Sequence, residues 1–363
     1  MKILHAIYSF NTGGSETMLV DIINQQCKTE SVNLLIVNDK FNKSLLETID
    51  KRTNVFLIGR KEGNKRQLLM AFWKINASLH KIRPDVIHCH DNKLFPFFIT
   101  QRKKAVLTVH NTNLSCWFLK CYQKVFAVSQ SVKEHVKKRA NVDAQLVYNG
   151  IAIDEYQQRI EFIPAKSFKI LQISRLDPKQ KGQHIAVQAI AYLKEKFPNR
   201  NISLSFVGDG ECETELKIFA VENKVEDTIV FLGQKSRSWI KEHLQDFDVL
   251  IQPSLYEGFG LTVIEGLAAG LPVIVSNLEG PKEILDSLNV GLTVEAGNPN
   301  DLAEKIRQIQ QDYLSGNLLN TNYLIKDKKQ LAAFDIQTTA LRYIEQYRKL
   351  ILKQRQHENP ACQ

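Results

Sequence analysis

Long apolar runs are missing from this sequence of 363 residues. The longest candidate, residues 267–275, is short and contains Gly270 and Pro272, whereas a membrane-spanning helix needs about 20 apolar residues. The apolar stretch at residues 1–7 is also too short to be the core of a secretory signal. These absences predict a protein that stays in the cytoplasm.

Cysteine pairs at metal-binding spacing are missing as well. The six cysteines are scattered without a Cys-x-x-Cys pair, at Cys27, Cys89, Cys116, Cys121, Cys212 and Cys362. Because no secretory signal is present, we expect reduced thiols, and we predict neither a zinc site nor a disulfide framework.

Acidic residues are scarce in the first part of the chain. Residues 1–150 hold 23 Lys and Arg against 11 Asp and Glu, whereas the remainder holds 25 against 28. The basic blocks at 102–104 and 137–139 contribute most visibly. This asymmetry suggests an anionic partner for the first half, although a solvated basic surface explains it equally well. No nucleic-acid-binding motif accompanies the charge, so nucleic acid is not an expected partner.

Short apolar runs alternate with longer amphipathic segments throughout the chain. The expected strands are residues 2–8, 32–37, 55–58, 85–88, 105–109 and 125–128, followed by 169–173, 203–207, 229–232, 249–251 and 272–275. Helical segments such as 182–197 and 213–224 lie between them. Strands that alternate with helices form parallel sheets covered on both faces, so two such series predict two doubly wound α/β domains.

The domain boundary is expected between residues 162 and 163, in a polar stretch that contains Pro164 and lacks periodicity. Residues 1–162 would then form the first domain and 163–337 the second. Apolar residues at helical spacing predict a C-terminal helix at about 338–354. The polar tail from Gln354 onwards is expected to fray.

Residues 253–265 carry the strongest functional signal. A predicted strand at 249–251 leads into a turn with Gly258 and Gly260, and a helix is expected to begin near Leu261. The unpaired N–H groups and positive dipole end of a helix start suit a diphosphate. The glycines allow the backbone to approach a ligand closely. The alternative is an ordinary surface turn.

Two carboxylates belong to this segment. Glu257 precedes the turn and can face a bound ligand. Glu265 lies about one turn into the helix, where its carboxylate can accept hydrogen bonds from ribose hydroxyls. Hydroxyl recognition would then fall to carboxylates and phosphate recognition to the backbone.

A second candidate segment, residues 173–182, follows the first strand of the second domain. Arg175 and Lys181 flank a loop at the carboxyl edge of the sheet, where ligands bind in open α/β folds. Arginine can fork onto phosphate oxygens, and lysine acts as a point charge. On its own, this segment fits a solvated basic loop at least as well.

Weaker signals lie at the ends of strands in the first domain. Gly13 and Gly14 permit close backbone approach, but they do not form a Gly-x-Gly-x-x-Gly fingerprint, and a simple tight turn remains open. His90 and His110 each follow a strand, where a neutral imidazole can hydrogen-bond a sugar hydroxyl. Either histidine alone is more often a satisfied polar residue. His88 lies one step deeper and is interpreted as structural.

Glu257-Gly258-Phe259-Gly260, followed by Glu265, resembles the Glu-x7-Glu signature of the family-4 retaining glycosyltransferases, which have the GT-B fold. Further segments resemble that family in the same order along most of the chain, at residues 13–16, 86–90, 108–110, 148–151, 174–182, 206–210 and 231–233. The resemblance implies two Rossmann-like domains facing across a cleft. The first would bind the acceptor and the second the donor, and the C-terminal helix would return to the first domain.

The resemblance also implies a role for each candidate residue. Arg175 and Lys181 would hold the pyrophosphate, Glu265 the ribose and Glu257 the donor sugar, which His110 would also contact. The catalytic residues would be His110, Glu257, Arg175 and Lys181. The donor site would be formed by Gly13, Gly14, His90, Arg175, Lys181, Gly208, Leu232, Glu257, Gly258, Phe259, Gly260, Leu261 and Glu265.

The implied reaction retains the anomeric configuration. No family residue is an obvious carboxylate nucleophile, so we expect front-face attack, with the leaving phosphate taking the acceptor proton. Residues 246–248 have the Asp-x-Asp pattern that holds a metal diphosphate in another glycosyltransferase architecture, but here they are interpreted as a helix-to-strand junction. We therefore expect no metal and no cofactor: Arg175, Lys181 and a helix terminus would neutralise the leaving diphosphate.

The expected donor is a nucleotide-diphosphate hexose, with UDP favoured only because it is the commoner base. The expected acceptor is a hydroxyl of a glycan or lipid-linked saccharide in cell-surface polysaccharide or lipopolysaccharide synthesis. The basic first domain would then dock on the inner face of the cytoplasmic membrane. Trp117, Phe118 and Leu119 beside Lys120 would add an apolar contact or belong to the core. Two alternatives stay open: a sugar-nucleotide 2-epimerase and a non-catalytic sugar-nucleotide-binding protein.

Overall fold

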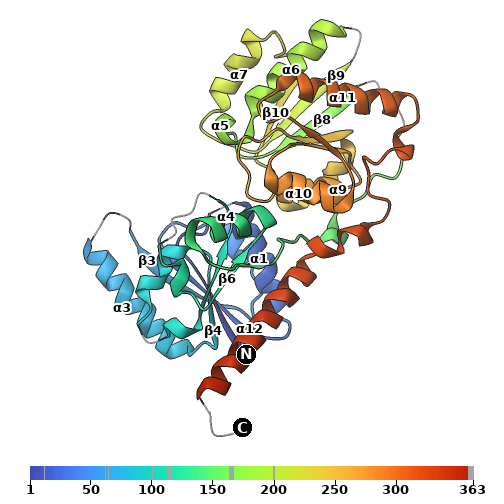
Figure 1. The fold of residues 1–363 in the computed structure, drawn as a ribbon. Coiled ribbons are helices and arrows are strands. Elements are labelled where there is room, and N and C mark those ends of the chain that lie inside the picture. Colours follow the sequence, from blue (N-terminus) through green and yellow to red (C-terminus); the bar gives the residue numbers. More distant parts are fainter. Residues whose placement is uncertain are drawn as a thin grey trace. The chain divides into compact units, whose positions relative to one another are not determined.

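The computed structural model describes residues 1–11, 13–61, 63, 65–99, 101–112, 117–162, 167–198 and 201–358. The chain divides into two compact units, one formed by Met1–Ile151 with Ala333–Gln363 and the other by Ala152–Ala332 (Figure 1). None of the helices in the described ranges combines the length and hydropathy of a membrane span.

The first unit is built on a seven-stranded parallel sheet in the order β3-β2-β1-β4-β5-β6-β7. Its strands are β1 (Lys2–Ile7), β2 (Ser31–Asn38), β3 (Asn54–Arg60), β4 (Val86–Cys89), β5 (Ala105–Val109), β6 (Lys124–Ala127) and β7 (Gln145–Leu146). Its helices are α1 (Gly14–Gln26), α2 (Lys43–Glu47), α3 (Lys65–Ile82), α4 (Gln130–Ala140) and α12 (Ile336–Glu358). The central strands are buried on both faces, which explains why they are almost continuously apolar.

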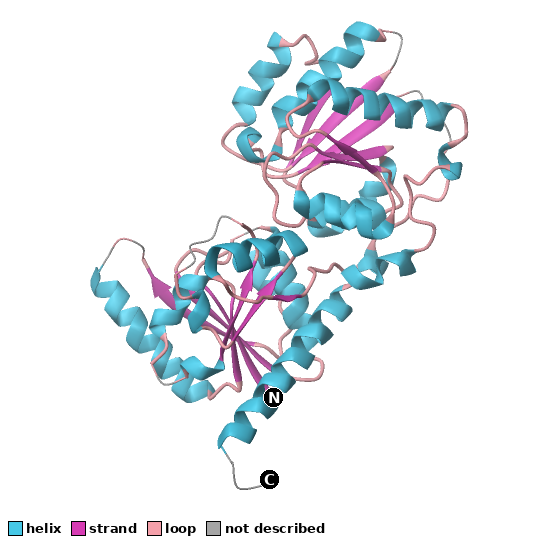
Figure 2. Ribbon diagram, in the orientation of Figure 1, coloured by secondary structure: helices cyan, strands magenta, loops and turns pink. Residues whose placement is uncertain are grey.

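The second unit has a six-stranded parallel sheet in the order β10-β9-β8-β11-β12-β13. Its strands are β8 (Phe168–Ile173), β9 (Ile202–Val207), β10 (Ile229–Gly233), β11 (Val249–Gln252), β12 (Val273–Ser276) and β13 (Leu292–Val294). Its helices are α5 (Pro178–Lys181), α6 (Gln183–Lys196), α7 (Glu213–Glu222), α8 (Arg237–His243), α9 (Leu261–Ala268), α10 (Glu279–Leu288) and α11 (Pro299–Leu314). In each unit helices flank the strands, as Figure 2 shows.

Two parallel, Rossmann-like sheets confirm the predicted fold class. Each strand predicted from the sequence is present, with its ends shifted by two residues at most. The strands β7 and β13 were not predicted, because runs of two and three residues are too short to show a period.

The chain passes from the first unit to the second at Ile151–Ala152, earlier than the expected boundary between 162 and 163. Tyr156 gives the physical reason. Its hydroxyl donates to Glu265 Oε1 at 2.9 Å, and its carbonyl accepts from Lys328 Nζ at 2.7 Å, so the chain packs on the second unit from this point. Residues 163–166, just after the expected boundary, lie outside the described ranges.

Helix α12 returns the chain to the first unit, where it packs along α1 (Figure 1). Tyr343 and Tyr347 anchor it from fully buried positions, and Tyr343 shares a hydrogen bond of 3.1 Å with Thr108 Oγ1. The helix continues to Glu358, so the prediction of a frayed tail is wrong for residues 354–358, which are helical. Residues 359–363 lie outside the described ranges.

Candidate functional site

In the second unit, Glu257 lies in the loop between β11 and α9, where two side chains hold its carboxylate. Lys181 Nζ donates to Glu257 Oε2 at 2.7 Å, and Gln252 Nε2 donates to the same oxygen at 2.8 Å. Thr262 Oγ1 donates to Gln252 Oε1 at 3.0 Å and so ties the group to helix α9. The Lys181 and Glu257 side chains are only 20% and 16% exposed, so the pair is shielded and its geometry is fixed.

The segment after β8, which ends in the short helix α5 with Lys181, packs directly on the loop that carries Glu257. The backbone N–H groups of Leu255 and Tyr256 both donate to the Gln180 carbonyl, at 2.8 and 3.1 Å. Gly182 has a φ of +68°, and a Cβ there would lie 2.0 Å from the Pro253 carbonyl oxygen. Only glycine permits this approach. The two loops meet because β8 and β11, the strands that precede them, are neighbours in the sheet.

Arg175 lies in the same loop region, but its side chain projects towards solvent. The side chain is 64% exposed, and its NH2 group lies 3.2 Å from Asp177 Oδ2. Its backbone is fixed, because Gln183 Nε2 donates to both Ser174 Oγ and the Arg175 carbonyl at 2.8 Å. An exposed ion pair of this kind is weak, so the guanidinium is available to an anionic ligand.

Helix α9 begins at Leu261, as predicted, with Gly260 as its N-cap. The φ of Gly260 is +103°, and a glycine has no side chain with which to cap the first turn. The glycine therefore serves both the turn and the open helix start. Glu265 lies in the next turn and accepts from Tyr156, a buried partner that sequence reasoning missed.

The remaining predicted donor residues of the second unit lie around the same edge of the sheet. The Gly208 N–H donates to the Gly233 carbonyl at 3.0 Å, and a Cβ at Gly208 would lie 2.0 Å from the Ser174 carbonyl oxygen. Leu232 is half-buried at the end of β10, and Phe259 is buried. The backbone of Gly258 lies against Gly280, whose Cβ would be 2.9 Å from the Gly258 carbonyl.

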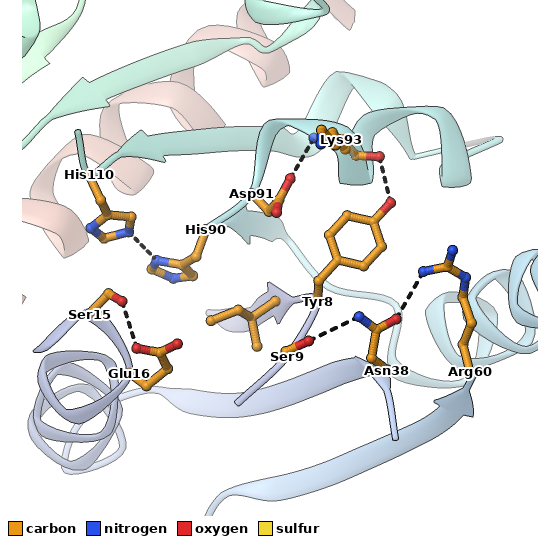
Figure 3. Close-up of a pocket in the computed structure, with 11 residues that line it drawn as sticks. Tyr8, Ser9, Ser15, Glu16, Asn38, Arg60, His90, Asp91, Lys93 and His110 are labelled. Carbon is orange, nitrogen blue, oxygen red and sulfur yellow. Dashed lines mark hydrogen bonds between the residues drawn. The ribbon is translucent and has the colours of Figure 1, made fainter. Parts of the chain in front are cut away.

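The first unit contains a polar pocket of about 550 Å³ at the carboxyl ends of its strands (Figure 3). It is lined by Ile7, Tyr8, Ser9, Ser15, Glu16, Asn38, Arg60, His90, Asp91, Lys93 and His110. His90 and His110, predicted as site residues, therefore meet on one wall. Gly13 and Gly14 lie beside it, at the start of α1, and the next residues, Ser15 and Glu16, share a hydrogen bond of 2.7 Å.

Sequence reasoning missed the opposite part of this pocket. Arg60 NH1 donates to Asn38 Oδ1 at 2.9 Å, Asn38 Nδ2 donates to Ser9 Oγ at 3.0 Å, and the Tyr8 hydroxyl donates to the Lys93 carbonyl at 3.0 Å. Apart from Lys93, each of these polar residues lies at or just after the carboxyl end of a strand. Their position at strand ends could have been noticed in the sequence. That they line one pocket follows only once the order of the strands in the sheet is known.

The described residues include one histidine cluster with metal-binding proportions. Ring nitrogens of His5, His88 and His90 lie within 4.8 Å of one another. All six nitrogens already take part in hydrogen bonds, to one another or to Gln26, Thr108, His110 and Tyr347. A metal ion at this position would have to displace some of those bonds.

Burial sets the charge of the same histidines. It lowers the pKa of His5 to about 4, partly offset by the hydrogen bond to Gln26, and lowers the pKa of His110 to about 4. Burial and the neighbouring imidazoles hold the pKa of His90 well below its usual range. All three rings are therefore neutral at pH 7.

The Asp-x-Asp segment forms the predicted junction between a short helix (Leu244–Asp246) and strand β11. Asp248 is buried, accepts from the Lys169 N–H at 2.7 Å and pairs with Arg159 NH1 at 2.7 Å. Its carboxylate therefore links the strand to neighbouring segments of the second unit.

Comparison with known proteins identifies the family. The chain matches the family model Glycosyltransferase Family 4 over residues 12–155 and the model Glycosyl transferases group 1 over residues 154–326. It is 27% identical over 266 residues to an uncharacterized glycosyltransferase of Methanocaldococcus jannaschii, covering 63% of this chain and 67% of that protein.

Two further proteins extend the comparison. The chain is 24% identical over 279 residues to the UDP-Gal:alpha-D-GlcNAc-diphosphoundecaprenol alpha-1,3-galactosyltransferase of Escherichia coli, covering 67% of this chain and 70% of that protein. The chain thus spans about two thirds of the length of these relatives. The crystal structure of Anabaena HepE in complex with UDP and glucose has the same fold, with a TM-score of 0.79, 21% identity and coverage of 96% of this chain and 100% of that one. Because the two family models together span residues 12–326, the chain belongs to the group 1, family 4 glycosyltransferases.

Proposed function

We propose that this glycosyltransferase moves a hexose from a UDP-sugar to a hydroxyl of a glycan or lipid-linked saccharide, with retention of configuration. The observation that carries the proposal is the meeting of Lys181, Glu257 and the open start of α9 within the second unit. A cation beside a helix start suits a diphosphate, and a fixed carboxylate suits the hydroxyls of a sugar. The product would belong to cell-surface polysaccharide or lipopolysaccharide synthesis.

Charge balance explains how the leaving group would be stabilised. Lys181 is paired with Glu257, and Arg175 is paired weakly with Asp177. A nucleoside diphosphate would attract both cations, while the N–H groups at the start of α9 would donate hydrogen bonds to its oxygens. Arg175, Lys181 and α9 would therefore neutralise the diphosphate without a metal ion.

The reaction balances without a covalent enzyme intermediate. The bond between the anomeric carbon and the diphosphate oxygen breaks, and a bond to the acceptor oxygen forms on the same face of the sugar. The acceptor proton passes to the leaving diphosphate. Glu257 would orient the sugar and offset its developing positive charge, and His110 in the first unit would contact a sugar hydroxyl.

The names of similar proteins support the choice of substrates. The Escherichia coli relative is named for a UDP-hexose donor and a diphosphoundecaprenol-linked acceptor, and the HepE crystal structure contains UDP and glucose. A UDP-hexose and a lipid-linked saccharide are therefore the first substrates to test. We further propose that the protein is cytoplasmic and works at the inner face of the membrane.

Helix α3 is the surface that we propose for membrane docking. It exposes Leu69, Met70 and Trp73, and Arg66 and Lys74 lie on the same helix. An exposed apolar patch with nearby cations is typical of helices that lie in an anionic lipid surface.

The sequence also suggested residues 117–119 for contact with lipid, but their side chains differ in exposure. Trp117 and Phe118 are exposed, whereas Leu119 is fully buried and belongs to the core. Trp117 is thus a second candidate for lipid contact, and Leu119 is not.

Product analysis tests the proposal. The full chain is incubated with UDP- and GDP-hexoses, with or without a diphosphoundecaprenol-linked saccharide, and the products are identified by mass spectrometry and by NMR of the new linkage. We expect a transferred sugar of unchanged anomeric configuration only when the acceptor is present. A 2-epimer formed from the donor alone would identify an epimerase, and donor binding without any product would identify a binding protein.

A further inference from the structure

Four side chains of the first unit form a hydrogen-bonded line that ends at the pocket. Gln26 Oε1 lies 2.9 Å from His5 Nε2, His5 Nδ1 lies 3.1 Å from His90 Nε2, and His90 Nδ1 lies 3.2 Å from His110 Nε2. Gln26 and His5 are fully buried, whereas His90 and His110 line the pocket (Figure 3).

The topology of the sheet creates this line. His5 belongs to β1, His90 follows β4 and His110 follows β5, and these three strands are adjacent in that order. The His90 N–H donates to the Ala6 carbonyl at 3.0 Å, which fixes His90 beside the end of β1. Gln26 is the last residue of α1 and closes the line from the helix layer.

The line has a direction, because each neutral imidazole has one donor and one acceptor nitrogen. With the Gln26 amide oriented so that its oxygen faces His5, that oxygen can only accept, so His5 carries its proton on Nε2 and its Nδ1 is an acceptor. His90 must then donate from Nε2 to His5, which leaves His90 Nδ1 as an acceptor. His110 must donate to it from Nε2, so His110 Nδ1 has no proton.

The line ends at a nitrogen that can accept one more hydrogen bond. His110 Nδ1 is buried and has no hydrogen-bond partner among the residues that the structure describes. The depressed pKa values of His5, His90 and His110 keep all three rings neutral, so the single-tautomer argument holds at pH 7.

We propose that Gln26, acting through His5 and His90, fixes the tautomer of His110 so that Nδ1 accepts a hydrogen bond from a hydroxyl of the bound substrate. Gln26, His5 and His90 are positioning residues in this scheme, and His110 is the residue that touches the substrate. The assignment of that hydroxyl to a sugar or acceptor rests on the proposed function, whereas the tautomer itself does not.

His88 lies beside the line but does not join it. Its ring centroid is 4.4 Å from that of His90, yet Nε2 bonds Thr108 Oγ1 at 2.7 Å and Nδ1 bonds the Tyr347 hydroxyl.

The orientation of the Gln26 amide decides which nitrogen of each ring in the line carries the proton. With its nitrogen towards His5, every donor and acceptor along the line would reverse, and His110 would carry its proton on Nδ1.

Nitrogen-15 NMR of histidine-labelled full chain measures this polarity directly. The His110 signals are assigned by their absence in a His110→Asn variant. At pH 7 and without ligand, we expect one His110 tautomer, with its proton on Nε2. A proton on Nδ1 in the wild-type protein would overturn the proposal, and this result does not depend on activity.

Substitution at Gln26 tests the origin of the tautomer. Gln26→Met removes the acceptor at similar size, so we expect a mixture of His110 tautomers and a kcat lowered by about tenfold, with the dissociation constant for UDP unchanged. Gln25→Met is the matched control, because Gln25 contacts Lys28 on the exposed side of the same helix.

A single, unchanged His110 tautomer in Gln26→Met would contradict the relay. Equal losses of kcat in Gln25→Met and Gln26→Met would contradict it too, because only Gln26 belongs to the line. If the wild-type chain transfers no sugar at all, the proposed function fails, while the NMR experiment still decides whether the relay exists.

Discussion

Lys181 Nζ and Glu257 Oε2 lie 2.7 Å apart although 76 residues separate them in the sequence. The contact joins the loop after β8 to the loop after β11, two parallel strands that are neighbours in the sheet. Parallel neighbours present their carboxyl ends at the same edge, so a cation from one loop and a carboxylate from the other meet there. The donor site that we propose is built around this pair.

Lys181→Met should reduce kcat by two orders of magnitude or more with any UDP-sugar donor, because the leaving diphosphate loses a shielded cation. The substitution also leaves Glu257 without its partner, so the affinity for the donor should fall as well. Steady-state kinetics measure both effects. Lys179→Met, in the same short helix but exposed, should behave as the wild type, and equal losses in the two variants would count against a specific role for Lys181.

Arg175→Ala should slow transfer by about a hundredfold or more without changing the melting temperature, because its guanidinium is exposed. Arg175→Lys should recover only part of the rate, since a lysine cannot fork onto two phosphate oxygens. Rapid-quench kinetics and thermal denaturation measure the two quantities. An unaffected rate in Arg175→Ala would rule out its role at the phosphates.

Stability should fall as the pH drops from about 6.5 towards 4. His5 and His110 have pKa values of about 4 in the folded chain, against 6.5 for an unperturbed histidine. The unfolded chain therefore binds more protons in this range, which stabilises it relative to the folded chain. A shift of this size corresponds to roughly 3 kcal/mol for each histidine, present above pH 6.5 and lost progressively below it.

Urea denaturation at pH 7 and at pH 4.5 measures this loss. His110→Asn should reduce the difference in unfolding free energy between the two pH values, because one imidazole with a lowered pKa is removed. His80→Gln is the matched control, since His80 is exposed and should not change the difference. The same pH dependence in both variants would mean that other groups are responsible.

Vesicle flotation tests the surface on α3. The wild-type chain should bind vesicles that contain anionic lipid, less strongly at high salt, and Trp73→Ser should weaken that binding several-fold because it removes exposed apolar area. Leu314→Ser removes an exposed apolar residue of the second unit and serves as the control. Binding that ignores the content of anionic lipid would contradict the docking hypothesis.

The strands and most helices could be predicted from the sequence because apolar periodicity reports local burial. The start of α9 at Leu261 was predicted for the same reason, from a short apolar strand followed by glycines. The contact between Lys181 and Glu257 could not be derived in this way. It depends on the order of strands in the sheet, which periodicity does not contain.

The hydrogen-bonded line of histidines was likewise predicted only in part from the sequence. His90 and His110 were recognisable because they end strands, whereas His5 and Gln26 were missed. His5 is a polar residue between Leu4 and Ala6 in a buried strand, which was a usable signal. Gln26 has no such signal, since its partner is set by how α1 packs on the sheet.

Calorimetric titration with UDP in the presence of EDTA tests the central claim most directly. That claim is that Arg175, Lys181 and the start of α9 hold the diphosphate without a divalent ion. The account predicts that the wild-type chain binds UDP in EDTA and that the double variant Arg175→Ala/Lys181→Met loses this binding. UDP binding that appears only when a divalent metal is added, or that survives intact in the double variant, would contradict the account.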